Sequence, residues 1–211
     1  MEKLLHKSWN RACSKLFHNI DNKIDDQLII CYNEPQRKYH NLEHLKDCIE
    51  NFEQVSHFAK YPEEIELALW FHDAVYNVKS LKHGDNEKKS AEWAKKVALS
   101  QNVSNEIADR IYNLIMATGH NEHKEMPPTQ DEMLMIDIDL AILGADQERF
   151  DKYEKQIREE YSWVPNWLYS LKRKNLLRLF LNKSSIYNTS YFKDNYELKA
   201  RKNLSKYIAE K

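Results

Sequence analysis

The stretch Ile65-Glu66-Leu67-Ala68-Leu69-Trp70-Phe71-His72-Asp73-Ala74-Val75-Tyr76 decides the fold of this chain. Pro62 precedes it at a position that suits the first turn of a helix, and Glu63 and Glu64 suit the positive end of a helix dipole. The stretch is apolar on nearly every side, so it predicts a buried central helix over about residues 62–77.

His72 and Asp73 stand side by side in this apolar segment. A buried, ionised carboxylate without a partner is very costly, so Asp73 must face a cation, a metal ion or strong hydrogen-bond donors. If both residues are helical, they point about 100° apart, and one ion serves both only from the flank of the helix. A hydrogen bond between His72 and Asp73 in the core is the alternative interpretation.

Residues that break helices are few. The chain of 211 residues has 3 glycines and 5 prolines, and they divide it into pieces of helical length. Apolar periodicity predicts helices at about 4–18, 25–32, 42–58, 62–77, 86–100, 104–118, 130–143, 147–161, 166–183 and 190–209. We therefore expect an all-α protein. No linker, repeat or low-complexity segment divides it, so we expect a single domain over residues 1–211.

The bulk composition excludes several classes of protein. The formal net charge of −1 gives no general affinity for nucleic acid, and the basic clusters near residues 172–174 and 201–202 match solvated helix faces. Cys13, Cys31 and Cys48 are odd in number and lack a C-x-x-C pair, which predicts free thiols. Without a signal peptide or a spanning segment, we expect a cytoplasmic protein with no membrane contact.

Four side chains have the chemistry of a metal site: His44, His72, Asp73 and Asp139. Mixed nitrogen and oxygen donors from separate helices suit a borderline-to-hard divalent cation such as Mn, Mg, Fe, Co, Ni or Zn. The absence of a cysteine from this set is more typical of a catalytic ion than of a closed structural zinc. Asp137 is the rival of Asp139, because two residues on a helix point roughly 200° apart and only one can enter the site.

The order His…His-Asp…Asp on a helical framework resembles the HD-domain superfamily of metal-dependent phosphohydrolases. Tyr39-His40-Asn41-Leu42-Glu43-His44 is similar to the Y-H-N-x-x-H signature of its cyclic-nucleotide phosphodiesterase branch. The likeness spans about residues 28–145. The helix at 4–18 and those over 147–209 are additions, although a group of bacterial proteins described only as predicted HD phosphohydrolases resembles the whole chain.

This resemblance implies that His44, His72, Asp73 and Asp139 bind the metal, and that His40 donates a proton to the leaving oxygen. Histidine titrates near neutral pH, which suits such a role. A surface or supporting histidine is the alternative for His40.

Further residues are candidates for the same site. We expect Arg37 to bind substrate phosphate, because guanidinium binds phosphate bidentately, although an ordinary surface arginine is equally consistent with the sequence. His120 is the candidate for a second metal or a phosphate contact, whereas His123 is read as a loop histidine. Glu87 joins Asp73 and His40 as a catalytic candidate that holds water, with helix capping as its alternative.

Together these features predict a hydrolase that acts on a small phosphate ester or nucleotide through metal-activated water. The alternative is a catalytically silent HD-type module that senses a nucleotide or a metal. Nucleic-acid binding is the weakest of the three interpretations. A homo-oligomer is compatible with the sequence, which does not specify the substrate or the number of ions.

Overall fold

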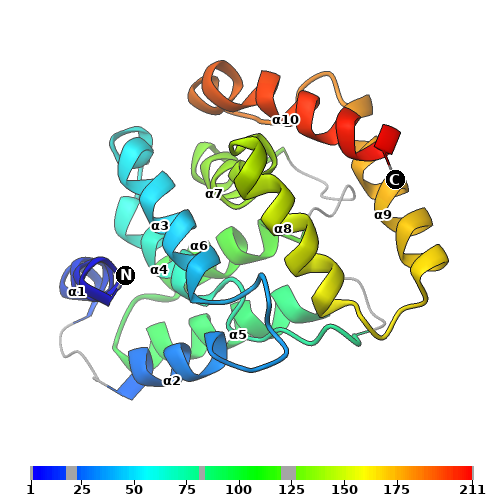
Figure 1. The fold of residues 1–211 in the computed structure, drawn as a ribbon. Helices are drawn as coiled ribbons and strands as arrows, with labels where there is room; N and C mark the ends of the chain where they lie inside the picture. Colours follow the sequence, from blue (N-terminus) through cyan, green and yellow to red (C-terminus); the bar gives the residue numbers. More distant parts are fainter. Residues whose placement is uncertain (1, 18–22, 81–83, 120–126, 211) are drawn as a thin grey trace. The chain divides into compact units, whose positions relative to one another are not determined.

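The computed structural model describes residues 2–17, 23–80, 84–119 and 127–210, and every regular element in these ranges is helical (Figure 1). The predicted all-α class is confirmed. The elements are α1 (Glu2–Leu16), α2 (Lys23–Tyr32), α3 (Leu42–Val55), η1 (Ser56–Phe58), α4 (Pro62–Phe71), α5 (Asp85–Ser100), α6 (Asn105–Ala117), α7 (Gln130–Leu140), η2 (Ala141–Gly144), α8 (Gln147–Glu160), α9 (Asn166–Asn182) and α10 (Ser190–Glu210).

The chain forms two compact units, Met1–Ile136 and Asp137–Lys211, and the expected single domain stays a prediction. The boundary falls inside α7. No proline, glycine or polar linker marks it in the sequence, because the connection is a continuous helix.

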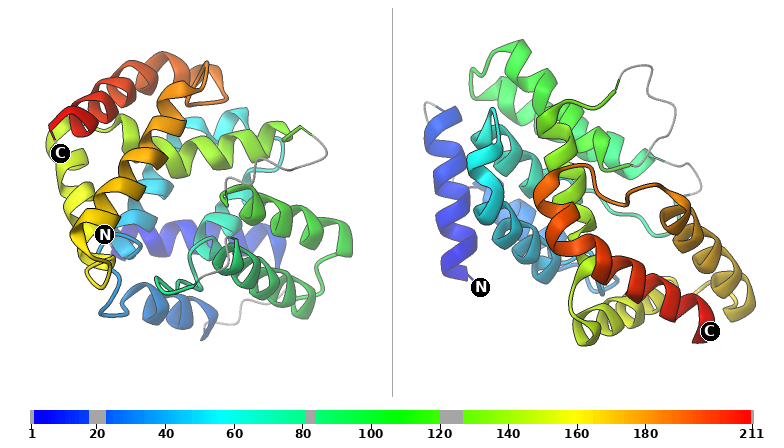
Figure 2. Two further views of the ribbon diagram at one scale, coloured as in Figure 1. Left: turned by 90° about the vertical axis from the view of Figure 1, so that its right-hand side faces the viewer. Right: turned by 90° about the horizontal axis from the view of Figure 1, so that it is seen from above.

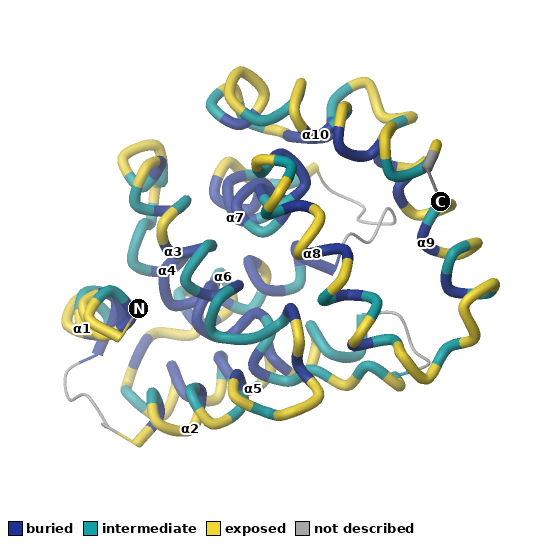
Figure 3. Tube along the Cα trace, viewed as in Figure 1, coloured by how far each residue is buried: buried dark blue, intermediate teal, exposed yellow. Residues whose placement is uncertain are grey.

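Helix α4 is the centre of the first unit. It packs against α1, α3, α5 and α6, and every residue from Glu64 to Phe71 is buried (Figure 3). Helices α5 and α6 lie side by side (Figure 2). The apolar stretch therefore forms the buried helix that its composition predicts, but the helix ends at Phe71 and His72 is its C-cap.

Two buried glutamates on α4 are paired with arginines of neighbouring helices. Arg110 donates from Nε and Nη2 to Glu64 at 2.8 and 2.6 Å, and Arg11 donates from Nε to Glu66 at 2.8 Å. Removing one partner of a buried pair leaves an uncompensated charge, which is strongly destabilising. The two pairs therefore fix which sides of α4 face α6 and α1.

In the second unit, α10 packs against η2 and α9 (Figure 2). Asn203 of α10 donates to the carbonyl oxygens of Leu143 and Ala145, each at 2.9 Å. A β-carbon on Gly144 would stand 2.7 Å from the carbonyl oxygen of Tyr196. Only glycine at this position lets α10 approach η2 so closely.

Asp137 has a structural role in this unit. Its buried carboxylate accepts hydrogen bonds from the backbone nitrogens of Asn188 and Thr189 at 2.8 and 2.7 Å, and from the Thr189 hydroxyl at 2.7 Å. These donors immediately precede α10, so the carboxylate satisfies backbone groups at the helix start. Burial raises the pKa of Asp137, and the hydrogen bonds from Thr189 and Asn188 oppose that rise.

The three cysteines form no disulfide bond. Cys13, Cys31 and Cys48 are free thiols, as predicted. Over the described ranges, no helix combines the length and the apolar character that crossing a bilayer requires.

We predict that Asp137→Ala lowers the free energy of unfolding by about 2–4 kcal/mol, because several charge-assisted hydrogen bonds at a helix start are lost together. Urea denaturation followed by circular dichroism measures the change. Asp194→Ala is the control: Asp194 is exposed on α10, and its loss should cost less than about 0.5 kcal/mol. Equal effects of the two substitutions would contradict the capping role.

Candidate metal centre

His44 is positioned by the N-terminal part of α3. The side chain of Asn41 caps this helix by accepting a hydrogen bond from the backbone nitrogen of Glu43 at 2.8 Å. His44 therefore lies in the first turn, and its side chain is buried. His40 lies before the cap and not in the helix, so the histidines are not a helical pair, although their ring centroids are 5.8 Å apart.

His72 and Asp73 occupy the turn that follows α4, and this corrects the helical geometry expected for them. The regular helix ends at Phe71, although His72 keeps right-handed helical dihedral angles, with φ −57° and ψ −37°. His72 Nε2 and Asp73 Oδ2 lie 3.2 Å apart. The side chains of His72 and Asp73 therefore bring one nitrogen and one oxygen close together.

Three ligand atoms of the first unit form a small triangle. His44 Nε2 lies 3.1 Å from His72 Nε2 and 3.4 Å from Asp73 Oδ2, and the third edge is the 3.2 Å distance given above. Atoms that bind one ion at about 2.1 Å stand about 3.0 Å apart in octahedral and about 3.4 Å apart in tetrahedral coordination. The edges of the triangle have the lengths that a shared divalent ion requires.

The alternative of a hydrogen-bonded His–Asp core fits these atoms less well. His72 Nδ1 lies 2.7 Å from the carbonyl oxygen of Leu69, which can only accept, so Nδ1 carries the proton. In the neutral ring, Nε2 then presents a lone pair to the triangle. Asp73 Oδ2 is buried and accepts no hydrogen bond from the described residues. A carboxylate oxygen and a nitrogen lone pair that face each other without a proton between them repel, and a cation between them would stabilise both.

The charge of Asp73 also suits a cation. Burial alone would raise the pKa of this carboxyl group, but its interactions with His72, His40 and His44 outweigh burial and hold the pKa well below its usual range. Asp73 is therefore an ionised ligand at neutral pH, as divalent metal binding requires.

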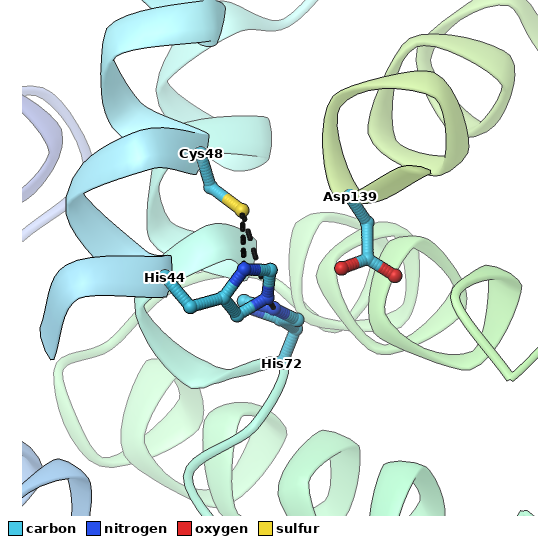
Figure 4. A group of neighbouring side chains, drawn as sticks. All are labelled: His44, Cys48, His72 and Asp139. Carbon is cyan, nitrogen blue, oxygen red and sulfur yellow. Dashed lines mark hydrogen bonds between the residues drawn. The ribbon is translucent and has the colours of Figure 1, made fainter. Parts of the chain in front are cut away.

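A second grouping in the first unit consists of His44, Cys48 and His72, without Asp73. Each offers one candidate ligand atom, and these atoms lie within 4.8 Å of one another (Figure 4). Asp139 is carried by α7, the helix that begins in one unit and ends in the other, and its place in the ligand set stays a prediction. Of the two rival aspartates, Asp137 holds the start of α10, which leaves Asp139 as the candidate ligand.

Cys48 is the residue that the sequence analysis did not include. It lies one turn after His44 on α3, and that i, i+4 spacing was the available signal. Its sulfur lies 3.7 Å from both Nδ1 and Nε2 of His44. Equal distances to both nitrogens at this range place the sulfur over the face of the ring, away from the in-plane lone pair of Nε2. We interpret Cys48 as packing against His44.

Arg37 is buried. Its side chain is 1% exposed, and Nε donates to Glu34 at 2.9 Å. Its Nη atoms donate to backbone carbonyls, with Nη2 3.0 Å from the oxygen of Ala74 and Nη1 bonded to the oxygen of Asp73. These carbonyls belong to the turn after α4. Arg37 therefore stabilises the backbone that presents Asp73. Its burial excludes the ordinary surface arginine, and its contact with substrate phosphate stays a prediction.

His40 lies beside the centre, half-buried, in a set of aromatic rings. It stacks on Tyr76 with the ring centroids 4.0 Å apart and the planes at 24°, and the Tyr39 ring meets its edge at 4.9 Å. Arg37 Nη1 also donates to the carbonyl oxygen of His40 at 3.4 Å. The ring is held in place while part of it reaches the surface.

The remaining predicted site residues have other outcomes. Glu87 lies in the first turn of α5, and its Cγ is 3.5 Å from where a β-carbon of Gly119 would stand. The catalytic role of Glu87 stays a prediction. His120 and His123 lie outside the described residues.

Comparisons with known proteins add no assignment, because no family model, curated protein or solved structure matches the chain.

We predict that Asp73→Ala and His72→Ala each weaken binding of Mn²⁺ or Zn²⁺ by more than about 100-fold, because loss of a supporting residue alone typically costs 10–100-fold. Isothermal titration calorimetry measures the affinity, and circular dichroism checks the fold. His57→Ala is the control, since His57 is exposed on η1 and should leave the affinity unchanged. Unchanged affinity in Asp73→Ala would remove Asp73 from the ligand set. Asp139→Ala applies the same test to the carboxylate of α7.

We predict that Cys48→Ser keeps the metal affinity within about threefold of the wild type, because its sulfur lies over the His44 ring and outside the lone-pair direction. The same titration measures it. A loss as large as that in His72→Ala would make Cys48 a ligand and would favour a closed structural site.

Proposed function

We propose that the chain is a metal-dependent phosphohydrolase of the HD type, acting on a small phosphate ester or nucleotide. The observation that supports this most directly is the triangle of His44 Nε2, His72 Nε2 and Asp73 Oδ2, with edges of 3.1–3.4 Å. Its order in the chain is that of the superfamily that the sequence resembles, with Asp139 as the last member.

In this proposal His44, His72, Asp73 and Asp139 hold the cation. A bound divalent ion supplies Lewis acidity toward a phosphoryl oxygen and lowers the pKa of a nearby water. Two neutral imidazoles and two carboxylates together carry a charge of about −2, so their complex with a divalent ion has no net charge. That balance suits a site that must also bind an anionic phosphate.

His40 is the proposed proton donor to the leaving oxygen. Its ring adjoins His44 at a centroid distance of 5.8 Å, and stacking on Tyr76 orients it. Arg37 acts through the backbone: it binds the carbonyl oxygens of His40, Asp73 and Ala74, so it fixes the donor and the metal ligand relative to each other.

The competing function is a metal or nucleotide sensor without turnover. Binding of the ion by Cys48 would favour this function, because a cysteine ligand is more typical of closed structural sites, but the position of its sulfur beside both nitrogens of His44 argues against that role. Hydrolysis assays on a panel of nucleotides and phosphate esters, with added Mn²⁺, Mg²⁺, Co²⁺ or Ni²⁺, separate the two functions. Turnover that chelation abolishes supports the hydrolase, whereas tight metal binding without turnover across the panel supports the sensor.

We predict that His40→Ala retains its metal and loses roughly 10²–10⁴-fold in hydrolysis rate, the usual contribution of a general acid. The loss should be smaller for nitrophenyl phosphate esters, whose leaving group needs no proton. Steady-state kinetics with two leaving groups, together with metal titration, measure both effects.

The control for His40 is again His57→Ala, which should change neither the rate nor the metal content. A uniform loss across leaving groups would assign His40 to positioning substrate or water. Loss of the metal would make it a ligand.

A further inference from the structure

Helix α9 has apolar residues on two opposite faces, and the second unit buries only one of them. Tyr169, Arg173, Leu177 and Phe180 are its buried residues, and their spacing defines a single stripe. Arg173 is neutralised there by Glu154, to which Nε and Nη2 donate at 3.1 and 2.6 Å.

The opposite face exposes large apolar side chains. Trp167 is 71%, Leu179 58% and Leu171 52% exposed, and Trp163, just before the helix, is 49% exposed. At about 100° per residue, Trp167, Leu171 and Arg178 fall within about 40° of one another, on the side away from the buried stripe. In Figure 3, the exposed residues of α9 are drawn in yellow. Several large apolar side chains exposed on one helix face are typical of an interaction site.

Basic residues border these apolar side chains. Lys172 and Arg178 are exposed and Lys174 is half-buried, and the two lysines fall on opposite edges of the same face. From Tyr161 to Lys193 the chain contains no Asp or Glu. The formal charge of the whole chain is −1, so this segment is a local concentration of positive charge on a nearly neutral protein.

We propose that this face of α9, defined by Trp163, Trp167, Leu171, Leu179, Lys172, Lys174 and Arg178, binds an anionic lipid surface. Trp and Leu side chains enter the boundary between headgroups and acyl chains, and Lys and Arg reach the anionic headgroups from the edges. Tryptophan is enriched at this depth of a bilayer. The sequence led us to expect no membrane contact. The proposal replaces that expectation for α9 alone, and it requires no transmembrane helix.

Two other occupants fit the face less well. A second copy of α9 would bring Arg178 and the lysines of two chains together, and like charges at an interface are unfavourable. Nucleic acid would match the charge, but exposed leucines contribute little to binding it, since bases stack on aromatic rings and phosphates bind polar groups. A lipid surface uses both the leucines and the basic residues.

Sedimentation of the full chain with vesicles tests the proposal. Vesicles of phosphatidylcholine alone are compared with vesicles of equal parts phosphatidylcholine and phosphatidylglycerol. We expect the wild type to sediment with the anionic vesicles, and added salt to weaken that binding.

Two variants separate the apolar from the charged contribution. Trp167→Ser with Leu171→Ser removes apolar contacts, and Lys172→Gln with Lys174→Gln and Arg178→Gln removes charge while leaving the Arg173–Glu154 pair intact. At about fivefold per basic residue near an anionic surface, the triple variant should bind roughly 100-fold more weakly. The matched control is Ile30→Ser with Leu198→Ser, which are 69% and 85% exposed on other helices and should bind like the wild type.

Wild type that stays in the supernatant, or control and α9 variants that lose binding equally, would overturn the proposal. Light scattering and a gel-shift assay with single-stranded RNA address the other occupants. If the wild type does not bind vesicles, two results would assign the face to another partner. One is a dimer that dissociates in the Trp167→Ser, Leu171→Ser variant. The other is RNA binding that the triple variant abolishes. Circular dichroism of each variant confirms that it folds.

Discussion

The half-buried carboxylate of Asp73, whose Oδ2 is fully buried, is the constraint on which the candidate centre depends. Its Oδ2 accepts no hydrogen bond within the described part of the chain, and two imidazole Nε2 atoms lie 3.2 and 3.4 Å away. A charge in such a position is tolerated only if a cation shares the space. The surrounding structure is arranged to keep this one atom in place: α3 supplies His44, the end of α4 supplies His72, and Arg37 binds the carbonyl oxygen of Asp73 itself.

The helical class and the residue types of the site could be predicted from the sequence, because both depend on local patterns. Apolar periodicity, together with few glycines and prolines, located the helices to within a few residues at most of their ends. The end of α4 could not be predicted, because residues 70–76 contain no helix breaker. The backbone that leaves the helix there is stabilised by residues distant in the chain: Arg37 binds the carbonyl of Ala74, and the Ser90 hydroxyl accepts from the backbone nitrogen of Val75 at 3.0 Å.

Two other features depend on tertiary contacts in the same way. Arg37 lies two residues before the histidine signature, and its sequence position is equally compatible with a phosphate contact and with burial. Only the position of the turn after α4 decides that its donors bind carbonyl oxygens. The boundary between the two units lies inside α7, where a composition-based search for linkers finds nothing.

The two aspartates of α7 show how one helix serves both stability and the candidate centre. Residues two apart on a helix point roughly 200° apart, so Asp137 and Asp139 cannot serve the same partner. Asp137 binds the donors that precede α10, whereas Asp139 stays the predicted ligand of the candidate centre. Helix ends fray unless their terminal groups are satisfied, and Asp139 is one residue from the end of α7. The hydrogen bonds of Asp137, and that of the Tyr187 hydroxyl to the carbonyl oxygen of Leu140 at 3.1 Å, therefore hold in helical form the turn that carries Asp139.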